Sequence, residues 1–124
     1  MKDGKHVILV IDDDQDILDA ARAVLESGGY IMIEAPSAHE GKDVFNKEKP
    51  DLLIVDIMME EIDAGIAFVE EIRSTGFEGP IFFLSSIGDE LSKQISTAKL
   101  GVTGILQKPL KKELVLELIN NQLK

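Results

Sequence analysis

The sequence predicts an α/β fold in which short apolar segments alternate with helices around one parallel sheet. Several of these segments are almost continuously apolar, as expected for strands that are covered on both faces. The segments between them carry apolar residues at helical spacing. Because the connections are short, we expect right-handed crossovers that place helices on both faces of the sheet.

The predicted strands are the apolar runs themselves. They cover His6–Ile11, Tyr30–Glu34, Leu52–Val55, Ile81–Leu84 and Val102–Leu106. In sheets of this kind, ligands bind beyond the carboxyl ends of the strands. The residues that follow each run are therefore the first candidates for a functional site.

The predicted helices follow the strands. The first covers residues 16–27 and is stopped by two glycines, Gly28 and Gly29. The second opens at Ser37, with Glu40 three residues later, which is the spacing of a capping box. The remaining three are expected over residues 66–74, 90–100 and 111–122.

Length and composition favour a single soluble domain over residues 1–124 and exclude several kinds of site. The chain has 124 residues, 44% of them apolar, and no linker-like segment divides it. Its net charge of -10 argues against direct binding of nucleic acid. The lack of cysteine excludes disulfides, zinc–thiolate sites and thiol catalysis. No segment resembles a membrane span or a signal peptide, so we expect a cytoplasmic protein without membrane contact.

Acidic residues follow the first and third predicted strands. Asp12, Asp13 and Asp14 come after the first, and Asp56 after the third. A helix cap explains one acid of the first group, Asp13 or Asp14, but not three. Two carboxylates about 5 Å apart repel by roughly 3 kcal/mol at an effective dielectric constant near 20. We therefore expect a positive charge near the acidic group that offsets this repulsion.

A hydroxyl and an ammonium group follow the fourth and fifth predicted strands. Taken alone, Ser85 is explained by a bond to a loop amide, and Lys108 by solvation. Taken together with the acids, they would meet at one edge of the sheet. A divalent ion, a carboxylate nucleophile, an ammonium and a hydroxyl form a complete set for Mg²⁺-assisted phosphoryl transfer to an aspartate.

Four segments give the chain a specific resemblance to a known family. They are VILVIDDDQDIL, DLLIVDIMMEEID, PIFFLSS and GVTGILQKP, in this order. Together they resemble the receiver domain of two-component response regulators, over essentially the whole chain. The resemblance implies a (βα)5 flavodoxin-like, three-layer sandwich whose parallel strands have the order 2-1-3-4-5.

The resemblance also implies roles for the residues at the strand ends. Asp56 would be the phosphoacceptor, and Mg²⁺ would be the cofactor. Asp13 would bind the metal directly and Asp12 through water, while Met58 would contribute its backbone carbonyl. Asp14 looks like an acid of the first helical turn rather than a ligand.

The resemblance extends to residues after the fourth and fifth strands, although some positions depart from the family pattern. Ser85 takes the place of the switch hydroxyl, and Lys108 would contact the phosphoryl group. The Lys108–Pro109 bond resembles the family's cis bond before proline. However, Ile105 stands where many members carry an aromatic switch residue, and Ala64 stands where glycine is frequent.

The resemblance implies a signalling role. A sensor histidine kinase would phosphorylate Asp56, and this would change the binding of an output protein or output domain. The chain would catalyse only its own phosphorylation and dephosphorylation, and the fourth and fifth helices could form a homodimer. No output domain follows Lys124, which fits either a stand-alone regulator or a receiver taken from a longer protein.

Two other functions are weighed against this one. Ile105 keeps open an interaction module that uses the same scaffold without phosphorylation. An aspartyl-phosphate phosphatase of the haloacid dehalogenase type would need an acid two residues after the nucleophile. Met58 occupies that position, so the phosphatase is the weaker alternative.

Overall fold

Five parallel strands form a single sheet in the computed structural model, which describes residues 1–57, 59, 64–86 and 101–123. Their order across the sheet is β2-β1-β3-β4-β5, as predicted. The strands are β1 (Val7–Ile11), β2 (Ile31–Ala35), β3 (Leu52–Asp56), β4 (Ile81–Ser85) and β5 (Gly104–Gln107). The expected (βα)5 flavodoxin-like arrangement is confirmed for the described part of the chain.

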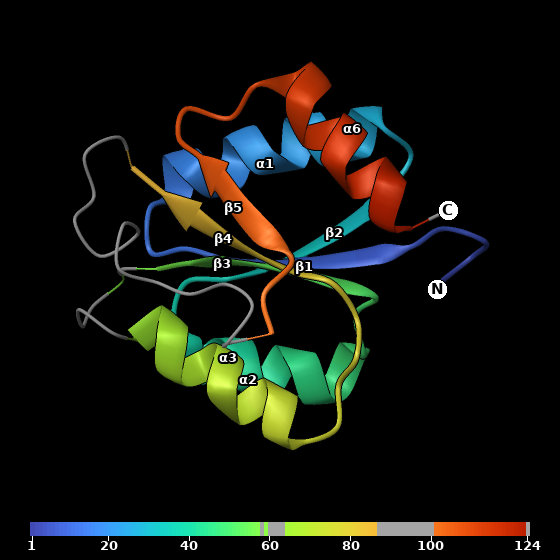
Figure 1. Ribbon diagram of the computed structural model, residues 1–124. Coiled ribbons are helices and arrows are strands. Elements are labelled where there is room, and N and C mark those ends of the chain that lie inside the picture. Colours follow the sequence, from blue (N-terminus) through green and yellow to red (C-terminus); the bar gives the residue numbers. More distant parts are fainter. Residues whose placement is uncertain (58, 60–63, 87–100, 124) are drawn as a thin grey trace.

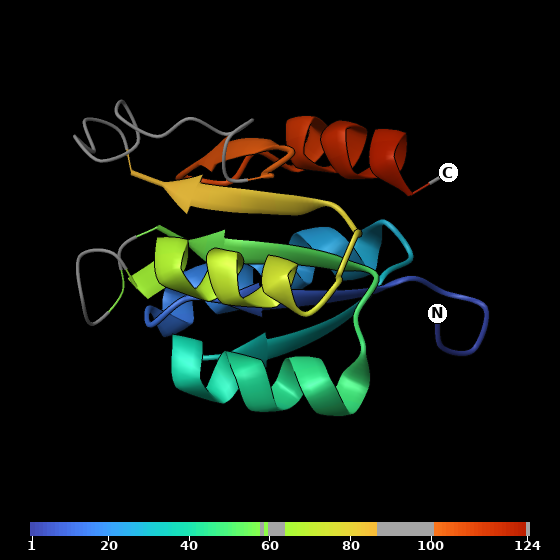
Figure 2. The same ribbon diagram turned by 60° about the horizontal axis from the view of Figure 1, so that its bottom comes forward.

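Helices cover both faces of this sheet and give the molecule three layers (Figure 1). On one face lie α1 (Gln15–Ser27) and α6 (Lys112–Gln122), and on the other lie α2 (Ala38–Glu48) and α3 (Ala64–Ser74). The same layers are seen from another side in Figure 2. The helix predicted over residues 90–100 lies outside the described residues. Among the described helices, none is long and apolar enough to cross a membrane.

The two covered faces of the sheet explain why β1 is apolar throughout. In β1, Ile8 and Val10 pack into the core that contains α1 and α6 residues. Leu9 and Ile11 point to the other side and pack into the core that contains α3 residues. Since side chains alternate along a strand and both faces are covered, each position of β1 is buried.

Local hydrogen bonds fix the starts of two helices. Asp14 is the N-cap of α1, and its side chain accepts a hydrogen bond from the Asp16 amide. Asp14 is thus the cap itself rather than an acid of the first turn. Ser37 caps α2, where its hydroxyl oxygen accepts from the amide of Glu40. The prediction that α2 opens at Ser37 is confirmed.

The start of β5 differs from the prediction. Val102 is buried, but it precedes the strand, which begins at Gly104. The preceding residue, Gly101, has a φ of 72° and belongs to a turn. Val102 is therefore apolar because it packs into the core and not because it pairs within the sheet.

The strand register brings the predicted site residues to one edge of the sheet. Ile11 pairs with Val55, so Asp12 leaves β1 beside Asp56 of β3. Ser85 ends β4 and pairs with Gln107 of β5, which directly precedes Lys108. Residues far apart in the sequence thus reach a common edge through the parallel topology alone.

Candidate functional site

Asp12 is the most deeply buried acid of the strand-end group, with 0% of the residue exposed. Its amide donates a hydrogen bond to the carbonyl of Ala35. Its Oδ1 atom accepts a hydrogen bond of 2.9 Å from the Asp14 amide. The local turn into α1 therefore holds one oxygen of the carboxylate and leaves Oδ2 directed toward the site.

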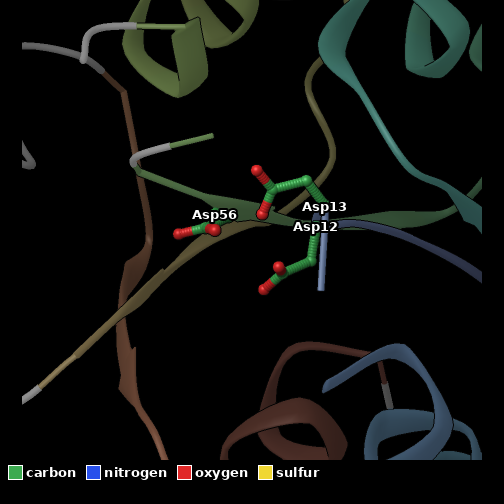
Figure 3. A group of neighbouring side chains, drawn as sticks. All are labelled: Asp12, Asp13 and Asp56. Atoms are coloured by element: carbon green, nitrogen blue, oxygen red, sulfur yellow. The ribbon is translucent and has the colours of Figure 1, made fainter. Parts of the chain in front are cut away.

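Asp56 and Asp13 complete a group of three carboxylates. One oxygen from each of Asp12, Asp13 and Asp56 can be chosen so that all three lie within 4.8 Å of one another. Figure 3 shows Asp56 entering from β3 and the other two from the end of β1. Asp56 is 5% exposed, whereas Asp13 is exposed to solvent. The site therefore combines two buried carboxylates with one that solvent can reach.

Lys108 brings the positive charge. Its Nζ atom lies 3.0 Å from Oδ2 of Asp12 and 3.4 Å from Oδ2 of Asp56. Burial disfavours the charged ammonium, but the contact with Asp12 and the charges of Asp56 and Asp12 outweigh this effect. The pKa of Lys108 consequently lies above its usual value. The backbone supports this placement, because the Lys108 amide donates to the carbonyl of Ser85 at 2.8 Å.

A metal ion fits this donor set. The group contains one ammonium and three carboxylates, so it keeps an excess of negative charge. Oδ2 of Asp12 is buried, and it accepts no hydrogen bond from the described residues, although Lys108 lies at ion-pair distance. Hard carboxylate oxygens in a compact cluster are the ligands that Mg²⁺ prefers. Asp12, Asp13 and Asp56 are thus residues that could hold a divalent ion.

The remaining predicted residues have different outcomes. Ser85 is buried at the end of β4, and its hydroxyl donates to the carbonyl of Ser86. The predicted cis bond between Lys108 and Pro109 is present. Ile105 lies in β5 and is partly buried against the core on the α3 side. Met58, the predicted carbonyl ligand, lies outside the described residues.

One residue beside the site was missed. Ala64, which by the family resemblance stands where glycine is frequent, is the first residue of α3. The close contact is made by the next residue, Gly65, which is buried against the backbone of Asp56. The sequence does contain this glycine, but nothing in a one-dimensional pattern shows which backbone atoms it approaches.

A family model and two curated relatives match this chain in sequence. The sequence model of the response regulator receiver domain matches residues 8–120. Response regulator MprA from Mycobacterium avium strain 104 is 33% identical over 102 residues, which is 82% of this chain and 44% of that protein. Transcriptional regulatory protein GlrR from Escherichia coli K12 is 33% identical over 116 residues, which is 94% of this chain and 26% of that protein.

A solved structure supports the same relationship. The receiver domain protein of a response regulator from Clostridium thermocellum superimposes with a TM-score of 0.83 at 29% identity. The match covers 94% of this chain and 93% of the other. By contrast, the chain spans less than half the length of the two curated relatives.

Proposed function

The chain belongs to the family of response regulator receiver domains, and we propose that it accepts a phosphoryl group on Asp56 from a sensor histidine kinase. The observation that carries this proposal is the meeting of Asp12, Asp56 and Lys108 at one edge of the sheet, with ion-pair distances of 3.0 and 3.4 Å. Burying charged side chains costs free energy unless they are paired. The packing of the core therefore does not explain why these charged residues are placed here.

Asp56 is the proposed nucleophile. It ends the buried strand β3, and Lys108 donates a hydrogen bond to its Oδ2 atom. In the transfer, a carboxylate oxygen of Asp56 forms the new bond to phosphorus, and the bond from phosphorus to the donor's imidazole nitrogen breaks. The rigid strand keeps this carboxylate in a fixed place beside the ammonium group.

The roles of the other residues follow from their charges and positions. Asp12, Asp13 and Asp56, together with the backbone carbonyl of Met58, are proposed to hold Mg²⁺. When bound, the ion would supply positive charge beside the phosphoryl oxygens. Lys108 is proposed to contact those oxygens as they become more negative.

Ser85 is proposed to act as the switch hydroxyl. Its present partner is the neighbouring carbonyl of Ser86, at 3.2 Å. A hydroxyl rotates easily and also donates to an anionic oxygen, so a phosphoryl group on Asp56 would compete for it. Exchange of that partner would carry the phosphorylation signal into β4 and the segment that follows it.

The proposed partners come from the family and the relatives. A sensor histidine kinase would donate the phosphoryl group, and an output protein or output domain would respond to it. GlrR is a transcriptional regulatory protein much longer than this chain, so we propose residues 1–124 as one receiver domain acting on such an output in the cytoplasm. A homodimer through α6 and the helix predicted over residues 90–100 is included in this proposal. The domain would bind neither nucleic acid nor membrane.

Members of this family are generally not classical enzymes, and we propose that this chain catalyses only its own phosphorylation and dephosphorylation. The first test is intact-protein mass spectrometry after incubation with a small phosphodonor and Mg²⁺. We expect one added phosphoryl group, which disappears with EDTA and in the Asp56→Asn variant. A folded, metal-binding protein without any adduct would instead favour the interaction module that works without phosphorylation.

A further inference from the structure

Gly65 lies where helix α3 contacts the backbone at the end of the strand that carries the proposed phosphoacceptor. It is the second residue of α3 and is buried. Its amide donates a hydrogen bond of 3.3 Å to the carbonyl of Ile57, the residue that follows Asp56. The first amides of a helix have no partner within the helix. One of them is therefore satisfied by the backbone beside the phosphoacceptor.

The space at Gly65 is closed by backbone and not by side chains. A Cβ atom at this position would lie 2.2 Å from the carbonyl oxygen of Asp56. It would also lie 2.9 Å from the carbonyl oxygen of Ile57 and 3.0 Å from its Cα atom. Since no flexible side chain can give way, an added methyl group would have to move either the start of α3 or the end of β3.

The conformation of Gly65 does not by itself require glycine. Among the described glycines, those with left-handed φ are Gly4, Gly29, Gly76 and Gly101. Gly65 is not one of them, so the close approach of two backbone segments explains why a side chain is absent. On the other side, the amide of Ile57 donates to the carbonyl of Leu84 in β4. The backbone after Asp56 is thus held between β4 and α3.

From this geometry we propose that Gly65 is a positioning residue for Asp56, an inference that rests on the proposed phosphoryl transfer. By allowing α3 to touch the backbone of Asp56, it fixes the carboxylate relative to Asp12 and Lys108. A shift of the reacting group by about 1 Å can lower a rate about 100-fold. We therefore expect Gly65→Ala to lower the phosphorylation rate constant by about 100-fold.

Gly41 provides a matched control. It is also a buried glycine in a helix on the same face of the sheet. The three atoms nearest to a Cβ atom there would all belong to side chains, and the first of them is Cδ1 of Ile11 at 2.5 Å. Gly41→Ala should therefore add a methyl group to a crowded, buried place, as Gly65→Ala does, but against side chains, so that the backbone of Asp56 stays in place.

The experiment compares wild type, Gly65→Ala and Gly41→Ala. Phosphorylation by a small phosphodonor with Mg²⁺ is followed by mass spectrometry, and each rate is divided by the folded fraction from circular dichroism. If Gly65→Ala is partly unfolded, the series is measured in trimethylamine N-oxide, which favours the compact state. A second measurement, without metal or phosphodonor, follows the chemical shift and hydrogen exchange of the Ile57 amide by NMR.

We expect Gly65→Ala to slow phosphorylation per folded molecule and to speed hydrogen exchange at Ile57, with Gly41→Ala changing neither. The role of Gly65 would be overturned if the two variants had equal phosphorylation rates per folded molecule and Gly65→Ala had the same Ile57 signals as wild type. The proposed function would then remain intact. If wild type takes up no phosphoryl group, the proposed function fails. The Ile57 signals then still decide whether Gly65 fixes the backbone.

Discussion

The two ends of the sheet each use aspartate, but they balance its charge differently. At the amino end, Asp51 precedes β3, and its Oδ2 atom accepts a hydrogen bond of 2.8 Å from the Val7 amide. The amino group of Met1 lies 3.1 Å from the same atom. At the carboxyl end, Lys108 faces both Asp12 and Asp56, and Asp13 adds a third carboxylate nearby.

This difference separates a structural role at the amino end from the role proposed for the carboxyl end. Asp51 is a single acid whose hydrogen bond joins the starts of β1 and β3, so its charge is balanced within the fold. Burial alone would raise the pKa of Asp51. The hydrogen bond from the Val7 amide and the positive charge of the amino terminus outweigh this effect, so the pKa lies below its usual value. The carboxyl end keeps an excess of carboxylates, which a bound divalent cation would balance.

The largest effect is expected for Lys108→Met at the carboxyl end. Loss of the ammonium should lower the phosphorylation rate constant by about 10²–10³-fold, as for other groups that stabilise developing charge. It should also raise the affinity for Mg²⁺, because Lys108 no longer competes for the oxygens of Asp12 and Asp56. Mass spectrometry gives the rate, and a metal titration gives the affinity.

The exposed neighbour Lys111 is the control for this variant. Lys111→Met removes the same charge from the same loop but should change neither quantity. If Lys108→Met weakens metal binding together with the rate, the lysine supports the shape of the site rather than competing with the ion. The proposal that Lys108 and the metal ion compete for the same carboxylate oxygens would then be wrong.

At the amino end, Asp51→Ala should affect stability and not phosphorylation. It leaves the Val7 amide without its partner, which costs about 1–3 kcal/mol of unfolding free energy for a buried polar group. Urea unfolding at neutral pH measures this difference, and the mass-spectrometric assay measures the phosphorylation rate per folded molecule. A large loss of that rate would contradict the separation between the two ends of the sheet.

The same variant tests the direction of the pKa shift. Because the pKa of Asp51 is lower in the folded state, its contribution is fully present above the unfolded value of about 3.8. It is lost as the pH falls through the folded-state value. The stability difference between wild type and Asp51→Ala should therefore shrink in acid, and a difference that grows there would show that the shift has the opposite sign.

The carboxyl end could be predicted from sequence because topology alone brings its residues together. Lys108 contacts Asp56 across 52 positions of the chain, and the apolar strands, together with the strand order that the family resemblance implies, are sufficient to predict this meeting. The amino end could not be predicted in the same way. Asp51 is an ordinary acid between Pro50 and Leu52 in the sequence, and its bond to Val7 depends on the exact register of two strands.

Contacts between backbones were also beyond prediction. The role of Gly65 depends on the distance between α3 and β3, which sequence patterns do not contain. Likewise, the choice of Asp14 rather than Asp13 as the cap depends on where α1 begins. Sequence patterns therefore identify which charges meet, whereas close approaches and single hydrogen bonds require coordinates.

The smallest expected effect concerns a second structural contact at the amino end, between Tyr30 and Asn120. Tyr30 precedes β2, and its hydroxyl donates a hydrogen bond to the side chain of Asn120 in α6. Asn120→Ala should lower the unfolding free energy by about 0.5–1.5 kcal/mol, the usual net contribution of one hydrogen bond. The phosphorylation rate per folded molecule should not change.

Tyr30 is also a direct probe of this end, because the chain contains one tyrosine and no tryptophan. Burial raises the pKa of its hydroxyl, so its contribution to stability is present below the unfolded value of about 10 and is lost as the pH rises through the folded-state value. An absorbance titration at alkaline pH should show a pKa above that of free tyrosine. If Asn120→Ala slowed phosphorylation while leaving stability and this titration unchanged, α6 would link the two ends, and the amino end could no longer be regarded as purely structural.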